Sequence, residues 1–209
     1  MDISSIIDSL HPLEIKVLMT LGTRPPGTAL ESEQLAEAAE LEPSQLSMAI
    51  EWLLAKALIT VHKETVTPIV SLTKTGEEYH QTAAPIERVL AAARDATNTG
   101  KRLTIPVLQS QGGLDPSDVS KAVGRLKKEG VLLIIQGGCI ETTGRPSSTA
   151  DALRTLLGQL HESPKELNSF TGTDRQVIED YAVKRGNAKE PFRIDERVTR
   201  SFVLSSSGT

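Results

Sequence analysis

A chain of 209 residues with 38% apolar and only 3% aromatic side chains has little bulky material for one large core, so we expect several small domains packed with aliphatic residues. The single cysteine, Cys139, excludes an internal disulfide framework and is typical of a reducing compartment. The net charge of −4 argues at first against a nucleic-acid-binding protein.

Charge is unevenly distributed along the chain. Residues 1–80 contain 5 basic and 12 acidic side chains, whereas residues 81–145 contain 9 and 6, and residues 146–209 contain 9 and 9. Any phosphate-facing surface is therefore expected beyond residue 80. The N-terminal residues lack the pattern of a secretory signal, and no apolar run approaches the ~20 residues that span a bilayer, so we expect a soluble, cytoplasmic protein without membrane contact.

The first predicted module covers residues 1–80. Its apolar spacing predicts three helices, over residues 12–21, 32–39 and 43–57. β-Branched residues around a charged turn then predict a hairpin of strands 58–61 and 67–72. Trp52, the sole tryptophan, is expected to fill a local core or a seam between domains.

The second predicted module, residues 81–145, has the clearest local signals. Helices are predicted over residues 85–97, 103–111 and 116–129. Asp115 is a good N-cap for the last of these helices, Pro116 suits its first position, and Gly130 suits its end. Strands 131–136 and 139–142 are joined by Gly137-Gly138, a two-residue hairpin signal.

The third predicted module, residues 146–209, is less regular. Helices are predicted over residues 149–160, 164–168 and 174–184, and alternating residues predict a hairpin of strands 192–196 and 199–204. The chain ends five residues after the last of these strands, from which we expect a fragment or a module that precedes another.

A short pattern recurs at the end of each module, in Leu72-Thr-Lys-Thr-Gly76, Ile140-Glu-Thr-Thr-Gly144 and Leu204-Ser-Ser-Ser-Gly208. The intervals between the first residues are 68 and 64, and each copy closes the same order of helix, helix, helix and hairpin. The sequence therefore predicts a mainly α protein with small β-hairpins (α+β), made of three tandem winged helix-turn-helix modules.

The third helix of the second module carries the main candidate site. Its apolar positions Val119, Val123 and Leu126 are expected to face inward, with Ala122 beside them. The polar residues of the opposite face are Ser117, Lys121, Arg125 and Lys128. Such a face can enter a groove or follow a phosphate ridge, although most rows of this kind are simply solvated.

The third module offers a second group of candidate phosphate contacts. Lys184 and Arg185 are predicted at the end of its last helix, where cations also complement the helix dipole. Arg193, Arg197 and Arg200 are predicted on its hairpin. We therefore include these five residues among the candidate nucleic-acid contacts.

Catalytic chemistry is not indicated by these residues. The four histidines are scattered, no metal-ligand spacing occurs, and neither a P-loop nor a dinucleotide-binding glycine motif is present. Cys139 lies in a predicted strand and is expected to be a buried, inert thiol. We expect no activity, metal or cofactor in this chain itself.

Five segments together resemble the N-terminal region of the archaeal and eukaryotic type of phenylalanyl-tRNA synthetase α subunit. They are His11-Pro-Leu-Glu-Ile-Lys-Val-Leu18, Leu72-Thr-Lys-Thr-Gly-Glu-Glu-Tyr79, Pro85-Ile-Glu-Arg-Val-Leu90, Ala122-Val-Gly-Arg-Leu-Lys-Lys-Glu-Gly-Val131 and Glu196-Arg-Val-Thr-Arg-Ser-Phe-Val-Leu-Ser-Ser-Ser-Gly208. In that family, three modules with a DNA-binding fold precede a class II catalytic domain.

The resemblance implies a noncatalytic arm that contacts tRNA. It also implies a cytoplasmic α2β2 phenylalanine-tRNA ligase that uses ATP and Mg²⁺, both in the catalytic domain that this chain lacks, with the rest of the α subunit and the β subunit as partners. Two alternatives stay open. One is a DNA-binding transcriptional regulator, for which residues 76–96 are the only candidate dimerisation helix, and the other is a protein-binding scaffold favoured by the acidic residues 1–80.

Overall fold

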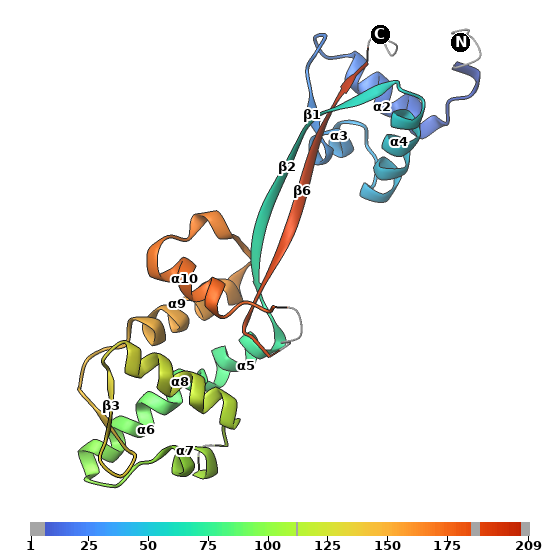
Figure 1. Ribbon diagram of the computed structural model, residues 1–209. Helices are drawn as coiled ribbons and strands as arrows, with labels where there is room; N and C mark the ends of the chain where they lie inside the picture. The colour runs from blue at the N-terminus through green and yellow to red at the C-terminus, as the bar shows by residue number, and fades with distance from the viewer. Residues whose placement is uncertain (1–6, 112, 185–188, 206–209) are drawn as a thin grey trace. The chain divides into compact units, whose positions relative to one another are not determined.

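The computed structural model describes residues 7–111, 113–184 and 189–205, which form an α+β protein (Figure 1). The chain divides into two compact units. The first unit contains residues 1–67 and 196–209, and the second contains residues 68–195. None of the described helices is both long enough and apolar enough to cross a membrane.

The described residues of the first unit form helices, one complete short strand and parts of two long strands. Its elements are α2 (Pro12–Gly22), β1 (Leu30–Glu31), α3 (Ser32–Ala38), α4 (Pro43–Ala55), residues 59–67 of β2 (Ile59–Leu72) and residues 196–204 of β6 (Phe192–Leu204). Proline opens both α2 and α4, where its missing N–H costs nothing. Val17, Leu35, Leu53 and Phe202 are among the buried side chains of the core that these elements share.

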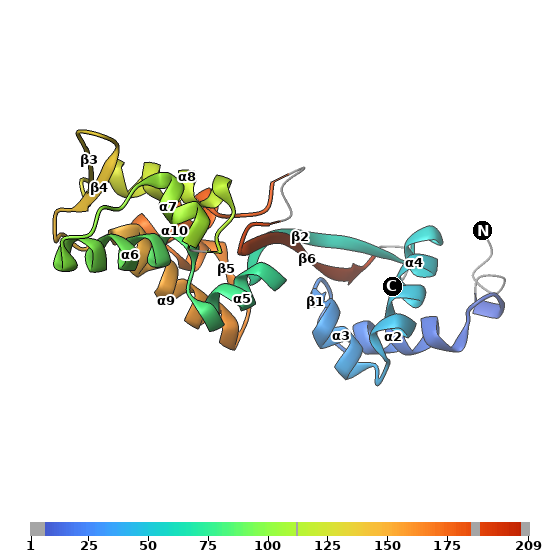
Figure 2. The ribbon, with the colours of Figure 1, turned by 90° about the horizontal axis from the view of Figure 1, so that it is seen from below.

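The second unit has its own aliphatic core. Its elements are residues 68–72 of β2, α5 (Lys74–Thr82), α6 (Pro85–Thr99), α7 (Ile105–Gln111), α8 (Pro116–Lys128), β3 (Leu132–Ile135), β4 (Cys139–Thr142), α9 (Ser148–Glu162), β5 (Lys165–Glu166), a 3-10 turn (Leu167–Ser169), α10 (Gly172–Asp180) and residues 192–195 of β6. Within this unit α8 packs on α6, and α9 packs on α5 and α10 (Figure 2).

The local signals of the second module are confirmed. The Asp115 side chain accepts the N–H of Ser117 at 2.9 Å and so caps α8, and Gly130 after the helix has a positive φ of 71°. Strands β3 and β4 pair in register from Leu132↔Thr142 to Ile135↔Cys139. The loop between them has three residues, 136–138, in place of the predicted two-residue turn, and both Gly137 and Gly138 have positive φ.

The predicted hairpins of the first and third modules are wrong. Residues 59–72 and 192–204 each form one unbroken strand, and these two strands, β2 and β6, are neighbours in a sheet of order β1-β6-β2-β5. The predicted turns at 62–66 and 197–198 contain no Gly, Asn or Pro to reverse the chain, whereas alternation of β-branched and charged residues suits an extended strand. Each strand thus pairs with a distant partner instead of folding back on itself.

The third module also differs from prediction in its helices. Residues 165–166 form strand β5, which pairs with Ile69 and Val70 of β2, in place of the short helix predicted at 164–168. Helix α10 ends at Asp180, so Lys184 lies beyond it and not in its last turn. Residues 76–96 are not one helix either, because Ala83 has a φ of 79° and separates α5 from α6.

The three-module division into residues 1–80, 81–145 and 146–209 stays a prediction. Both proposed boundaries lie inside the second compact unit. The units follow a different line because β6 comes from the end of the sequence and pairs with β1 in the first unit, with Leu30 opposite Phe202. Dividing the sequence into consecutive segments cannot predict that its last strand pairs with a strand near its start.

Gly76 gives a test of packing in the second unit. A Cβ at this helical position would lie 2.3 Å from the carbonyl oxygen of Pro191 and 3.1 Å from Cδ2 of Leu72. We expect Gly76→Ala to lower the free energy of unfolding by about 1–3 kcal/mol, because a backbone atom cannot move aside cheaply. Chemical denaturation measures this change.

Gly158 of α9 is the matched control, because a Cβ there would have no neighbour within 4 Å. Gly158→Ala should raise stability by up to about 1 kcal/mol through helix propensity. Equal effects of the two substitutions would contradict the close approach at Gly76.

Candidate nucleic-acid interface

Helix α8 carries the principal candidate residues, and its amphipathic pattern is confirmed. Val119, Ala122, Val123 and Leu126 are buried, as the sequence predicts. On the other side Ser117, Lys121 and Lys128 are exposed, whereas Arg125 is only partly exposed. The predicted face therefore exists, but its members differ in what they contact.

Lys121 is held by two groups from the segment that follows α10. Its Nζ lies 2.7 Å from Oε1 and 3.0 Å from Oε2 of Glu190, and 4.5 Å from the centroid of the Tyr181 ring. A lysine placed over an aromatic face and beside a carboxylate has its charge compensated within the chain. Lys121 is thus a poorer phosphate ligand than its place on α8 predicts.

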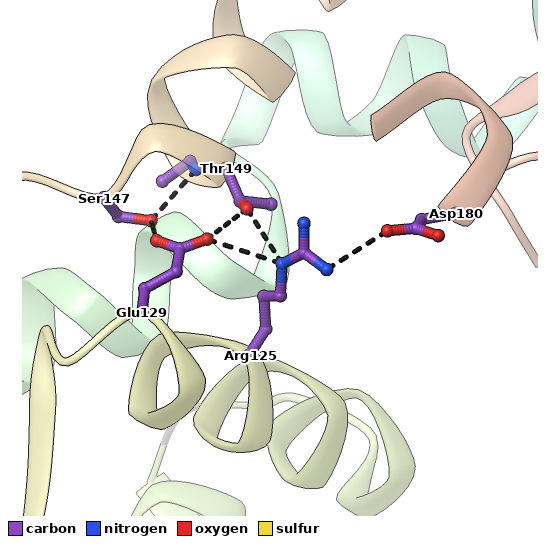
Figure 3. A network of polar contacts seen from close by, with 6 residues as sticks. Arg125, Glu129, Ser147, Thr149 and Asp180 are labelled. Carbon is purple, nitrogen blue, oxygen red and sulfur yellow. Dashed lines mark hydrogen bonds and ion pairs between the residues drawn. The ribbon is translucent and has the colours of Figure 1, made fainter. Parts of the chain in front are cut away.

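Arg125 belongs to a polar network that joins α8 to α9 and α10 (Figure 3). Its Nε donates to Oγ1 of Thr149 at 2.9 Å, and its Nη1 donates to Oδ2 of Asp180 at 3.1 Å. Oε1 of Glu129, the C-cap residue of α8, lies 3.4 Å from the same Nε. Arg125 therefore spans the start of α9 and the end of α10.

Glu129 completes this network by accepting from two hydroxyl groups. The Ser147 Oγ donates to Oε2 of Glu129 at 2.6 Å, and the Thr149 Oγ1 donates to Oε1. Ser147 also caps α9, since its Oγ accepts the N–H of Ala150 at 3.1 Å. Ser147 and Thr149 are almost fully buried, so their bonds to Glu129 are shielded from water, whereas the side chains of Arg125 and Asp180 are 26% and 36% exposed.

Lys128 differs from its two neighbours. Its side chain is exposed and makes no ion pair with any residue that the structure describes. A groove of about 360 Å³ lies beside it, with Lys121, Arg125, Asp180 and Tyr181 among its lining residues. Of the three cations predicted to act together, Lys128 alone has the open surroundings that the prediction assumed.

Two further cations lie at the end of α8 and are not among the predicted site residues. Lys127 is exposed in the same last turn of α8. The Nη1 atom of Arg145 lies 3.8 Å from the position that a Cβ on Gly130 would take. We call Lys127, Lys128 and Arg145 the α8 end cluster. Lys127 could have been predicted from the sequence, because it is next to Lys128. Arg145 could not, because only the fold brings it to the end of α8.

The remaining predicted residues are divided between the two units. Arg193 belongs to the second unit and pairs with Asp195 at 2.9 Å, whereas Arg197 and Arg200 belong to the first unit. Arg200 pairs with Glu64 at 2.6 Å. Lys184 is exposed after α10, and Arg185 lies outside the described residues. Their nucleic-acid contacts stay a prediction.

A cavity of about 170 Å³ lies beside Lys121 and is lined by both tyrosines of the chain, Tyr79 and Tyr181. Burial raises the pKa of each tyrosine to about 12, and the nearby negative charge of Glu190 acts in the same direction. Asp118 lines the same cavity, and burial raises the pKa of its carboxyl group as well. The cavity therefore disfavours negative charge.

Among the described residues, no group of three His, Cys, Asp or Glu side chains is placed to hold a metal ion. Cys139 is buried, and its Sγ lies 3.0 Å from Nε of Arg102, which donates to it.

The ionisation of Tyr79 and Tyr181, followed by absorbance at 295 nm, tests how deeply the two tyrosines of the cavity are buried. Since both have a pKa of about 12, the folded chain should form almost no tyrosinate at pH 10.5, whereas the denatured chain should titrate near pH 10. A raised pKa in the folded state means that stability is present below pH ~10 and is lost as pH rises toward 12. A native midpoint near 10 would contradict the burial.

The Glu129 network gives a second prediction. Glu129→Ala removes the acceptor of two buried hydroxyl groups and should lower the free energy of unfolding by about 2–3 kcal/mol. Glu141→Ala, at an exposed position of β4, is the control and should change stability by less than about 0.5 kcal/mol. Similar losses in the two variants, measured by urea denaturation, would show that the network is not stabilising.

No protein-family model matches this chain. It is similar to phenylalanine-tRNA ligase alpha subunits, with 25% identity to that of Borreliella burgdorferi over 98% of the chain, and 27% identity to that of Treponema pallidum over 96%. The alpha subunit of Methanothermobacter thermautotrophicus is 30% identical over 66% of the chain.

The chain spans only part of each of these relatives. It covers 38% of the Borreliella protein, 42% of the Treponema protein and 25% of the Methanothermobacter protein. The similarity therefore supports the synthetase family for a partial region of such a subunit.

Proposed function

We propose that this chain is a noncatalytic, tRNA-contacting N-terminal region of a phenylalanine-tRNA ligase α subunit. The observation that carries the proposal is similarity to such subunits over 96–98% of the chain, combined with coverage of only 38–42% of their length. In this proposal the catalytic domain, its ATP and Mg²⁺, and the β subunit lie outside the chain, and the whole enzyme is cytoplasmic.

We further propose that the fold is built from winged helices. The order α6, α7, α8, β3, β4 supports this for the middle of the chain, since three helices are followed by a short hairpin. In the first unit α2, α3 and α4 precede strand β2, and β6 supplies a second strand from the end of the sequence. The third set, α9, the 3-10 turn and α10, is followed by β6.

The proposed tRNA contact lies at the α8 end cluster. Lys127, Lys128 and Arg145 make no side-chain ion pair with any described residue, whereas carboxylates compensate Lys121 and Arg125. Such cations bind phosphate by charge and release counterions from the nucleic acid. Phosphate contacts position a molecule without reading its bases, which is the task of an appended arm.

A second candidate, a protein-binding scaffold, has one specific observation in its favour. Two of the three predicted cations of α8 are engaged by Glu190 and Asp180 of the same chain, so their charge is less available to a polyanion. Binding of tRNA and of duplex DNA at several salt concentrations separates the functions. Preference for tRNA supports the synthetase arm, preference for DNA supports a regulator, and binding of neither supports a scaffold.

The α8 end cluster gives the sharpest test. Lys127→Gln with Lys128→Gln should weaken tRNA binding about tenfold or more at low salt. It should also reduce the slope of log K against log salt by about 1–2, because the variant neutralises fewer phosphates and its binding therefore releases fewer counterions. Filter binding or anisotropy measures both quantities.

The control removes two exposed cations from the acidic first unit, as Lys16→Gln with Lys63→Gln. This variant has the same net charge as the first and should bind tRNA with nearly unchanged affinity and slope. Equal weakening in both variants would mean that only the total charge matters and would remove the assignment of the site to α8.

A further inference from the structure

The first unit contains a depression that the proposed function does not use. It has a volume of about 360 Å³ and is lined by Ser9, His11, Glu14, Trp52, Ala55 and Lys56, from the start of α2 and the end of α4. A pocket of this size can hold one side chain or a small molecule. Its lining combines an indole ring with a carboxylate.

Glu14 is the unusual member of this lining, because it is a charged residue with only 1% exposure. Its Oε2 accepts the N–H of His11 at 2.6 Å and lies 2.8 Å from Nζ of Lys56. Its Oε1 is buried and has no hydrogen-bond partner among the described residues. A buried carboxylate oxygen without a donor is unfavourable, so this atom has unused capacity to accept a hydrogen bond.

Trp52 forms the apolar wall of the depression. It is 39% exposed, which corrects the expectation that it fills a core or a seam. The His11 ring meets it edge to face, with centroids 5.1 Å apart and an interplanar angle of 62°. A partly exposed indole ring beside an acid is a favourable surface for a cation.

The surroundings of the depression also favour a cation. Residues 1–67 and 196–209, which make up the first unit, contain 11 acidic and 6 basic side chains. Phosphate groups are repelled by such a surface, whereas basic polypeptides are attracted. The lining and the overall charge of the unit therefore select the same class of ligand.

We propose that this depression binds an arginine side chain of a basic partner protein. The planar guanidinium stacks on the Trp52 ring and donates to Oε1 of Glu14, while Lys56 keeps its contact with Oε2. The Lys56 side chain is 30% exposed, and its Nζ is held by the carbonyl oxygen of Ser9 at 2.9 Å as well as by Oε2, which leaves Oε1 for the guanidinium. Arginine fits better than lysine because its fork of donors and flat face serve both partners at once.

The first experiment uses Trp52 as its own probe, since it is the sole tryptophan of the chain. We expect the peptide acetyl-Gly-Arg-Gly-amide to change the tryptophan fluorescence saturably, with a dissociation constant that is roughly millimolar for one side chain. The same peptide with citrulline, which is neutral and nearly the same shape, should cause no saturable change. No saturable change with the arginine peptide, or an equal one with citrulline, would overturn the proposal.

The second experiment assigns the binding to the two residues. Glu14→Gln should weaken binding about tenfold or more, because it removes the charge that faces the guanidinium. Glu14 also caps α2, so circular dichroism must first show that the variant is folded. Trp52→Leu, followed by calorimetry, removes the stacking surface and keeps the carboxylate of Glu14, and it should abolish detectable binding; because Trp52 also contacts His11, the N-cap of α2, the same check of folding applies.

Met48→Ala is the matched control, because Met48 is 44% exposed one turn earlier on α4 and does not line the depression. It should bind the arginine peptide as the unchanged chain does. Unaltered binding in both the Glu14 and the Trp52 variant would place the peptide elsewhere and refute the site.

Discussion

The carboxylate of Glu129 controls what α8 presents to the outside. It accepts from the buried hydroxyl groups of Ser147 and Thr149 and lies beside Arg125, whose far end reaches Asp180. Because the two hydroxyl groups are shielded from water, their bonds to Glu129 are strong, and loss of the carboxylate would leave two costly unpaired polar groups. Helix α8 is thus fixed against α9 and α10, and the guanidinium of Arg125 serves to hold these helices together.

This constraint moves the candidate phosphate surface along the helix. Lys121 and Arg125 are compensated by Glu190 and Asp180, so their charge attracts a polyanion less than isolated cations would. Lys127 and Lys128, in the last turn, also complement the negative end of the α8 dipole. A charged helix end suits contact with a sugar-phosphate backbone better than insertion into a groove.

The two units have different surface chemistry. The first combines an excess of acid with the partly exposed Trp52 and the buried Glu14, which together suit a cationic ligand. The second contains the α8 end cluster, which suits an anionic one. The net negative charge of the whole chain comes from the first unit, which contains 11 acidic and 6 basic side chains, and so it does not describe the second unit.

The sequence alone determined the features that depend on neighbouring residues. The inward stripe of α8, its cap at Asp115 and the Gly137-Gly138 hairpin follow from short spacing and backbone preference, which any fold must satisfy locally. Only the tertiary structure decided that β2 and β6 are single paired strands, that Arg125 is engaged and that Arg145 lies at the end of α8. These outcomes depend on contacts between residues far apart in sequence. The spacing of apolar and polar residues within a segment does not reveal which distant residues will meet.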